Sequence, residues 1–127
     1  MKKAILLFSM LFAINVMATL PLLPPLLYNV ENNVVKYNNS EIIGADKESF
    51  QVLSYDYAKD KNNVYYRGAI IENADPLTFE SLDPYFAYYS QDKQYVYYQG
   101  KVVKGADSAT FEDLNLELSR DKNNVYY

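Results

Sequence analysis

The heptapeptide DKNNVYY occurs at residues 60–66 and again at residues 121–127, and the variant DKQYVYY occupies residues 92–98. An aspartate that opens a turn can accept hydrogen bonds from the backbone amides ahead of it, and an asparagine at the fourth position tolerates the left-handed conformation. The Val-Tyr-Tyr that follows is rich in strand-forming residues. Each copy therefore predicts the turn and second strand of a β-hairpin, with the turn residues Asp60, Asn63, Asp92, Asp121 and Asn124.

The heptapeptide is part of a longer repeat. The valines Val34, Val64, Val96 and Val125 follow one another at intervals of 30, 32 and 29 residues. Columns of Asp, Phe and Leu keep the same register, because in each unit Phe follows Asp by four positions and Leu follows Phe by three. This periodicity predicts one domain over residues 30–127, with units at about 30–59, 60–91 and 92–120 and a final half-unit at 121–127.

A second segment of the repeat, ADPLTFESL at residues 74–82, has a different pattern. Asp75 suits a helix N-cap, Pro76 suits the first helical position, and Phe79 and Leu82 would share one face of a short helix. We expect such a helix in every unit, with cap and core residues Asp46, Phe50, Leu53, Asp75, Phe79, Leu82, Asp107, Phe111 and Leu114.

The predicted fold class is therefore mainly all-β. Each unit would be an antiparallel β-hairpin or three-stranded meander, with a second tight turn at Arg67-Gly68, followed by a helix of one or two turns that carries Phe and Leu. Whether the units share one sheet or stack as a solenoid stays open at this stage.

Three departures from the repeat carry expectations of their own. The first unit has Glu31-Asn32-Asn33 before its valine and lacks the tyrosine pair there, which is typical of a terminal capping repeat. Tyr95 stands where the left-handed asparagine is expected, so this turn should be strained or of another type. The insertion at residues 83–89 predicts an irregular loop.

The N-terminus has the pattern of a bacterial secretory signal peptide. Two lysines precede the apolar run AILLFSMLFAINVMA at residues 4–18, and Val16 and Ala18 suit cleavage after Ala18. The alternative is an uncleaved anchor, because the Pro/Leu-rich segment at residues 19–29 prolongs the apolar region, although its prolines disfavour a continuous helix. We expect export to the periplasm, the cell surface or the medium, with membrane contact only before cleavage. Because the chain has no cysteine, it cannot carry a lipobox.

Charge disfavours nucleic acid as a partner. Without residues 1–18 the chain keeps 10 basic and 16 acidic residues, a net charge of 10 − 16 = −6. Nucleic-acid phosphates require a basic face, so we expect no nucleic-acid partner.

The repeat pattern identifies a family resemblance. DKNNVYY, together with the following G-A-D-x-x-T-F-x-x-L pattern, resembles the DKNYY repeat family of bacterial exported proteins over roughly residues 30–127. The resemblance implies an exported, repeat-built, β-rich protein. It implies no activity and supplies no catalytic residue.

The composition also disfavours catalysis. The chain has neither His nor Cys, which removes the commonest general bases and soft metal ligands. A pair of carboxylates could still hydrolyse glycosides, but a carboxylate present once in every unit is better explained by capping. Asp60-x-Asn62 matches only the start of a calcium-binding EF-hand loop. We therefore expect no enzyme, no catalytic or metal residues and no cofactor, and keep a carboxylate-based hydrolase as a distant alternative.

The fourteen tyrosines suggest a binding surface. Adjacent tyrosines on a strand point to opposite faces, so one of each pair should be buried and the other could meet a protein or glycan partner. Tyr66 and Tyr98 are the candidates, because Lys36 is their counterpart in the first unit. We expect a binding module of the cell envelope; the alternative is a purely structural or self-associating envelope protein.

Overall fold

The structure, a computed structural model, describes residues 27–83, 88–115 and 117–127. The expected signal peptide, most of the segment 19–29 and the centre of the insertion at 83–89 lie outside these residues. No helix among the described residues is long and apolar enough to cross a membrane.

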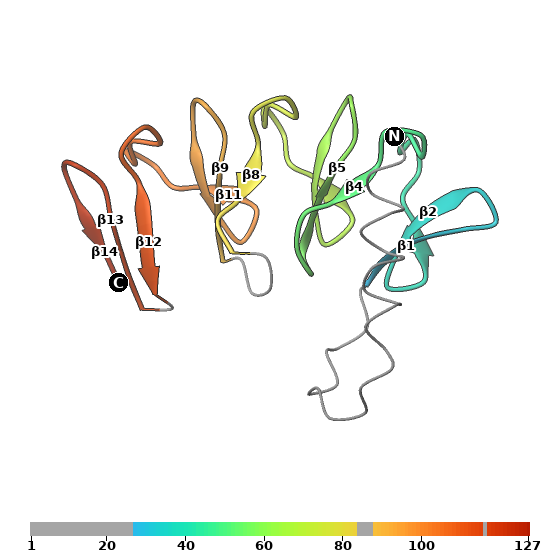
Figure 1. Cartoon of the computed structure of the whole chain (residues 1–127), viewed down its shortest axis with the longest axis horizontal. Coiled ribbons are helices and arrows are strands. Elements are labelled where there is room, and N and C mark those ends of the chain that lie inside the picture. The colour runs from blue at the N-terminus through green and yellow to red at the C-terminus, as the bar shows by residue number, and fades with distance from the viewer. Residues whose placement is uncertain (1–26, 84–87, 116) are drawn as a thin grey trace, which may run out of the picture.

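The described chain is all-β and forms four small antiparallel sheets that lie side by side in a row (Figure 1). The first and last sheets have three strands and the two middle sheets have four. In chain order the strands are β1 (Tyr28–Glu31), β2 (Val34–Tyr37), β3 (Ser40–Glu41), β4 (Gln51–Val52), β5 (Tyr57–Lys59), β6 (Val64–Tyr66), β7 (Ala69–Ile70), β8 (Glu80–Ser81), β9 (Tyr89–Gln91), β10 (Val96–Tyr98), β11 (Lys101–Val102), β12 (Glu112–Asn115), β13 (Leu118–Arg120) and β14 (Val125–Tyr126).

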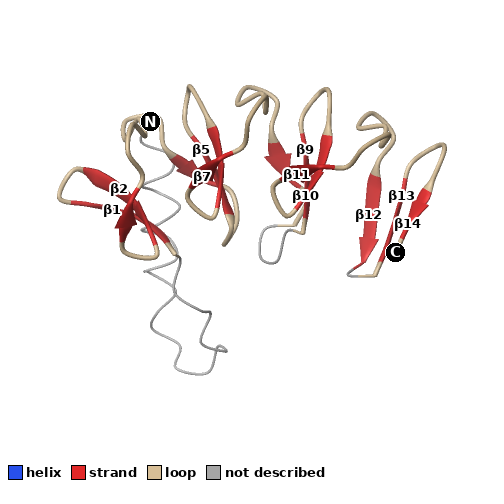
Figure 2. Cartoon of the chain, turned by 180° about the vertical axis from the view of Figure 1, so that it is seen from behind, coloured by secondary structure: helices blue, strands red, loops and turns tan. Residues whose placement is uncertain are grey.

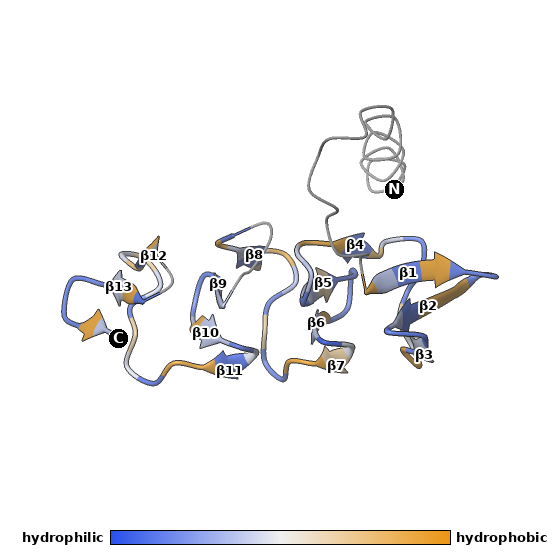
Figure 3. Ribbon diagram, turned by 90° about the horizontal axis from the view of Figure 1, so that it is seen from below, coloured by the Kyte–Doolittle hydropathy of each residue, from blue (hydrophilic) through white to orange (hydrophobic). Residues whose placement is uncertain are grey.

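Each sheet is a meander in which neighbouring strands are consecutive in the sequence. The second sheet has the order β4-β5-β6-β7 and the third has β8-β9-β10-β11. Viewed from below, β4, β8 and β12 follow one edge of the row, and β7 and β11 follow the other (Figure 3). The repeats therefore form separate sheets in a linear array rather than one shared sheet.

The expected helix is wrong: no part of the described chain is helical (Figure 2). At residues 76–78 the chain makes a single turn, in which the Thr78 amide donates to the Asp75 carbonyl over 3.2 Å. The turn does not continue as a helix, because Glu80 and Ser81 pair with β9 as strand β8. A segment this short gains little from helical hydrogen bonds alone, so tertiary pairing decides its conformation.

The left-handed conformation expected at the fourth position of the DKNN turn is also wrong. Neither Asn63, Asn124 nor Tyr95 has a positive φ, so the strain expected at Tyr95 is absent. The aspartate side chain holds this turn instead, by accepting two amide hydrogen bonds. In the second and third units the left-handed pairs lie at the second turn, at Arg67-Gly68 and Gln99-Gly100, as a type I′ hairpin turn requires. In the first unit the first turn also has such a pair, Asn32-Asn33.

Strand pairing shifts the register of the first unit by one residue. Ile42 donates its amide to the Val35 carbonyl just as Ile71 donates to Val64, so Val35 rather than Val34 is the repeat valine. Tyr37 is consequently the counterpart of Tyr66, and the proposed equivalence with Lys36 is wrong. A two-residue turn follows each of these tyrosines and fixes the alignment of the units. In the first unit this turn is Asn38-Asn39, and the column of valines alone did not reveal it.

Candidate functional site

The aspartate of DKNNVYY links one sheet to the loop that precedes it. Asp60 Oδ1 accepts the amides of Asn62 and Asn63 over 2.8 and 2.7 Å. Its Oδ2 accepts the Tyr65 hydroxyl over 2.6 Å and the amide of Asp46, in the preceding loop, over 2.9 Å. Asp92 and Asp121 accept the same four kinds of donor. We call this four-bond arrangement the aspartate clasp.

The lysine of the motif contacts the same preceding loop. Its amide donates to a hydroxyl, from Lys61 to Ser49 Oγ over 2.9 Å and from Lys93 to Thr78 Oγ1 over 3.1 Å. Its amine lies 3.3 Å from the loop aspartate, Asp46 or Asp75. Lys122 makes the corresponding contacts with Thr110 and Asp107. The three loop aspartates predicted as helix caps thus lie at the junctions between units.

The clasp changes the acidity of its members. The amide of Asp107, with the Tyr126 hydroxyl and two turn amides, lowers the pKa of Asp121. Burial alone would raise the pKa of Asp60, but its hydrogen bonds outweigh burial and lower it. Burial, followed by the bond to the ionised Asp60, raises the pKa of Tyr65. The clasp therefore holds a carboxylate and a neutral phenol over a wide pH range.

Phenylalanine from the connecting loop joins the tyrosines of successive sheets. The Phe79 ring centre lies 5.6 Å from that of Tyr57 and 5.5 Å from that of Tyr97. Phe50 and Phe111 occupy the equivalent places, and all three are buried. The leucines expected beside them differ: Leu53 and Leu82 are half-buried, and Leu114 is 45% exposed. Leu53 and Leu82 follow a strand and Leu114 lies within β12, so none continues a helix from its phenylalanine, although Leu53 packs against the core cluster that contains Phe79.

A pair of tyrosines in one sheet receives the glycine turn of the next sheet. The Tyr28 hydroxyl accepts the amide of Gly68 over 2.9 Å, and the Tyr57 hydroxyl accepts that of Gly100 over 2.8 Å. A Cβ on Gly68 would lie 2.9 Å from Tyr37 Cβ, and one on Gly100 would lie 2.7 Å from Tyr66 Cδ1.

We call each pair of rings a tyrosine seat. The ring centres lie 4.7 Å apart in Tyr28–Tyr37, 5.0 Å in Tyr57–Tyr66 and 4.9 Å in Tyr89–Tyr98. The seats therefore recur with one geometry in three successive sheets.

A known family of proteins has the same repeating unit. The DKNYY family sequence profile matches twice, over residues 28–83 and 72–127. The chain belongs to the DKNYY family. No curated protein and no solved structure matches the chain.

The two tyrosines chosen as ligand-binding candidates have different surroundings in this DKNYY array. Tyr66 is half-buried under Gly100 and also lies beneath the Arg67 guanidinium, 5.3 Å from its ring centre. Tyr98 is 43% exposed. It stacks on Tyr88, with ring centres 6.3 Å apart and planes 23° apart. Tyr88 was not among the candidates, because it belongs to the insertion at residues 83–89 and so has no counterpart in the other units.

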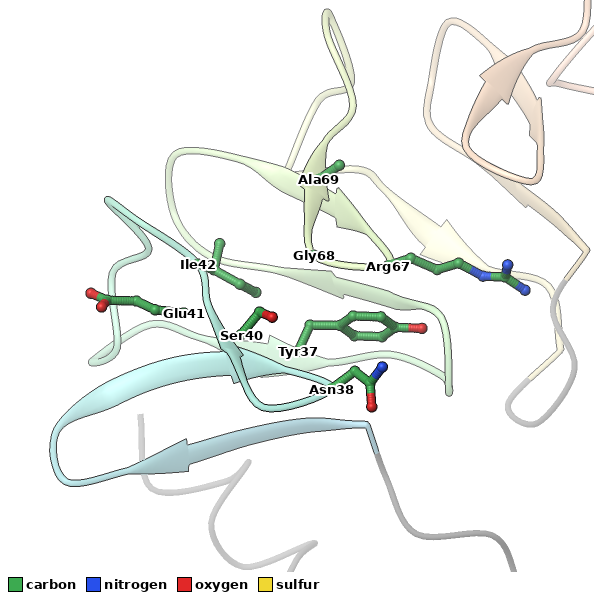
Figure 4. A pocket seen from close by; sticks show the side chains of 8 residues that line it. All are labelled: Tyr37, Asn38, Ser40, Glu41, Ile42, Arg67, Gly68 and Ala69. Atoms are coloured by element: carbon green, nitrogen blue, oxygen red, sulfur yellow. The ribbon is translucent and has the colours of Figure 1, made fainter.

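A surface hollow of about 310 Å³ lies where the first two DKNYY units meet (Figure 4). Glu41 is the one carboxylate in its lining, and the Glu41 and Arg67 side chains point away from each other (Figure 4). The hollow therefore does not bring together the two carboxylates that a glycosidase needs. Among the described residues, no group of three or more acidic side chains is arranged to hold a metal ion.

Proposed function

We propose that this DKNYY protein is a non-catalytic, exported binding module of the bacterial cell envelope. It would recognise a protein partner through the exposed tyrosines of its third sheet. The observation that carries the proposal is the difference between equivalent tyrosines: Tyr37 and Tyr66 are half-buried by the next unit, whereas Tyr98 is 43% exposed and stacks on the exposed Tyr88. Exposed aromatic pairs are enriched at protein interfaces.

Several features support a binding role over catalysis. Asp46 and Asp75 each accept a hydroxyl hydrogen bond from their own loop and pair with a lysine of the next unit, so these carboxylates already have structural partners. The N-terminal apolar run with its two lysines supports export. The absence of tryptophan, a favoured platform for sugar rings, makes a protein partner the better choice than a glycan.

The test starts with the protein purified after export from a bacterial host, with its N-terminus determined by mass spectrometry. The immobilised protein is crosslinked to envelope proteins, and the crosslinked peptides are identified. We expect crosslinks near Tyr88 and Tyr98, and loss of the captured protein in Tyr98→Ala. Tyr127→Ala is the matched control, because Tyr127 is 99% exposed but forms no ring pair with another residue of the described chain. Capture that Tyr98→Ala leaves unchanged would reject this surface, and binding on a glycan array would reassign the partner class.

Self-association is the second candidate function, favoured by one observation. Among the described residues β14 pairs with β13 alone, and Val125 on it is 52% exposed. An uncovered strand edge can pair with another chain. Analytical ultracentrifugation over a range of concentrations distinguishes the two: association that increases with concentration favours self-assembly, and a monomer throughout favours a separate partner.

A further inference from the structure

The strands β3, β7 and β11 share one side of the row of sheets. Each pairs with a single strand, β3 with β2, β7 with β6 and β11 with β10. No described strand lies beyond them, and all three are on the same side of the row (Figure 3). We call this side the outer edge. Its backbone groups are open to pairing with another chain.

The outer edge is exposed even in a unit that has a neighbour on each side. The second sheet lies between the first and the third (Figure 1), yet Ile70 on β7 is 53% exposed and Glu72, just after β7, is exposed as well. Val102, the counterpart of Ile70, is 47% exposed, and Ile43, the counterpart of Glu72, is 86% exposed. A following unit therefore does not cover this edge, and its exposure is a property of each repeat.

The charged side chains of the outer edge lack partners within the described chain. Glu41, Glu72, Lys101 and Lys104 are exposed, and none of them forms an ion pair with another described residue. Every other exposed basic side chain in the described chain does form one, namely Lys61, Arg67, Lys93, Arg120 and Lys122. The free basic groups are therefore concentrated on this edge.

The sign of these charges changes along the row. The acidic residues Glu41 and Glu72 belong to the first two units, and the basic residues Lys101 and Lys104 belong to the third. The outer edge thus carries no net charge, although the chain has 16 acidic and 12 basic residues. Two such edges that meet in the same direction bring like charges together. In opposite directions, they bring Glu41 of each copy to Lys101 and Lys104 of the other.

We infer that the outer edge is the interface of a symmetric dimer, in which a second copy of this chain packs with its row reversed. The two-fold axis passes near the second sheet, so that β7 meets β7 and Ile70 of each copy packs beside the axis. β3 of each copy meets β11 of the other. Because the units repeat one geometry, reversing one row keeps the strands of the two copies in step.

The occupant is a second copy because the edge is complementary to itself. Charged residues on an edge usually keep edges apart. Here their signs oppose only the alignment of two rows in the same direction, and they favour the reversed alignment. This inference goes beyond the proposed function and does not rest on it, since neither Tyr88 nor Tyr98 lies on an outer strand.

The first experiment is sedimentation equilibrium of the protein purified after export, over a range of concentrations. We expect a monomer–dimer equilibrium that stops at the dimer, because a two-fold interface is closed. A monomer at every concentration up to about 1 mM would overturn the inference, since weaker association is not specific binding. Assemblies that keep growing beyond the dimer would overturn it as well.

The second experiment reverses the charges of the edge. The double variant Lys101→Glu with Lys104→Glu places acidic groups against Glu41 of the other copy, and we expect at least about tenfold weaker dimerisation because like charges then meet. Adding Glu41→Lys should restore dimerisation, a recovery that a folding defect could not produce. Unchanged association of the double variant, or no recovery in the triple variant, would overturn the reversed alignment.

The third experiment tests the centre of the interface. Ile70→Glu places two like charges beside the two-fold axis and should also weaken dimerisation by at least about tenfold. Leu77→Glu is the matched control, because Leu77 is 88% exposed but lies in the loop before β8, away from the outer strands. The control should dimerise as the parent protein does. Dimers that persist in Ile70→Glu, or that are lost equally in both variants, would overturn the outer edge as the interface.

The proposed function fails or stands separately. Loss of the crosslinked partner in Tyr98→Ala concerns the third sheet's tyrosines, and dimerisation of the same variant should be unchanged. If no partner is captured but the charge reversal and its recovery behave as expected, the dimer stands without the proposed function.

Discussion

Gly100 offers a direct measure of how tightly neighbouring repeats pack. It has a φ of +77°, and a Cβ added to it would lie 2.7 Å from Tyr66 Cδ1 and 2.8 Å from Tyr66 Cβ. Gly105 has nearly the same backbone angle, +83°, but a Cβ added there meets nothing within 4 Å. The pair Gly100→Ala and Gly105→Ala therefore separates the cost of the backbone conformation from the cost of the contact between sheets.

The expected magnitudes follow from these two geometries. An alanine in the left-handed region costs about 1–2 kcal/mol at either position. At Gly100 the clash with Tyr66 adds the cost of overpacking, about 1–3 kcal/mol. Displacing the turn would also lengthen the 2.8 Å bond from the Gly100 amide to the Tyr57 hydroxyl. Gly100→Ala should thus lower the free energy of unfolding by about 2–5 kcal/mol, and Gly105→Ala by about 1–2 kcal/mol.

The assay is equilibrium unfolding in urea, followed by tyrosine fluorescence and by far-ultraviolet circular dichroism. Both changes restrict the unfolded chain equally, because each replaces glycine by alanine. Their difference therefore reports the contact with Tyr66. Gly100→Ala should cost less in a Tyr66→Ala protein than in the parent protein, because the substitution removes Tyr66 Cγ and Cδ1 from the methyl group and leaves only the contact with Cβ. Equal losses for Gly100→Ala and Gly105→Ala would refute close packing of the turn on the tyrosine seat.

Three further predictions concern the clasp and the last strand. Tyr97→Phe removes the 2.8 Å hydrogen bond to Asp92 and should lower the free energy of unfolding in urea by about 1.5–3 kcal/mol, the range for bonds to charged groups. Tyr57→Phe is the comparison, because the Tyr57 hydroxyl bonds to a neutral amide. Equal losses for the two variants would contradict a charge-assisted clasp. The clasp lowers the carboxyl pKa of Asp60, Asp92 and Asp121, so its stability is present above the unfolded value of about 3.9 and is lost as the pH falls below it. Burial raises the pKa of Tyr57 to about 12, so stability should also be lost as the pH rises from about 10 towards 12; a melting temperature constant across both ranges would contradict these shifts. Deleting residues 125–127 removes the Tyr126 hydroxyl from Asp121 and should lower the melting temperature by several degrees, about 4 °C or more, whereas an unchanged value would show that β14 contributes nothing.

The hairpins were predictable because their signals are local. The turn at Asp60 uses side-chain bonds to amides two and three residues ahead, and such short-range chemistry is visible in the sequence. The position of Phe79 in the core also followed from its column in the repeat. The helix prediction failed because Asp75 and Thr78 form the same capped turn at the start of a helix and in a loop between strands. Pairing of β8 with β9, which brings in residues from the next unit, decided between the two.

The difference in exposure between the two candidate tyrosines could not be predicted, for a related reason. Tyr66 and Tyr98 both follow Val-Tyr and both stand two residues before a glycine, so their place in the repeat predicts the same exposure. What separates them is whether a glycine from the following sheet packs on the ring, as Gly100 does on Tyr66. That contact joins residues more than thirty positions apart. It could be found only once the sheets were placed side by side.

The sequence by itself determined the repeat, the hairpin turns, the strand-forming tyrosines and the family, because each depends on residue types at fixed short spacings. The tertiary structure alone decided that the units form separate sheets in a row and that the aspartates and lysines of DKNNVYY connect neighbours. It also decided which tyrosines are covered, because a side chain is buried only by what another unit brings to it. Val125 and Tyr98 show this most clearly, since both repeat the residues of buried positions and both are exposed.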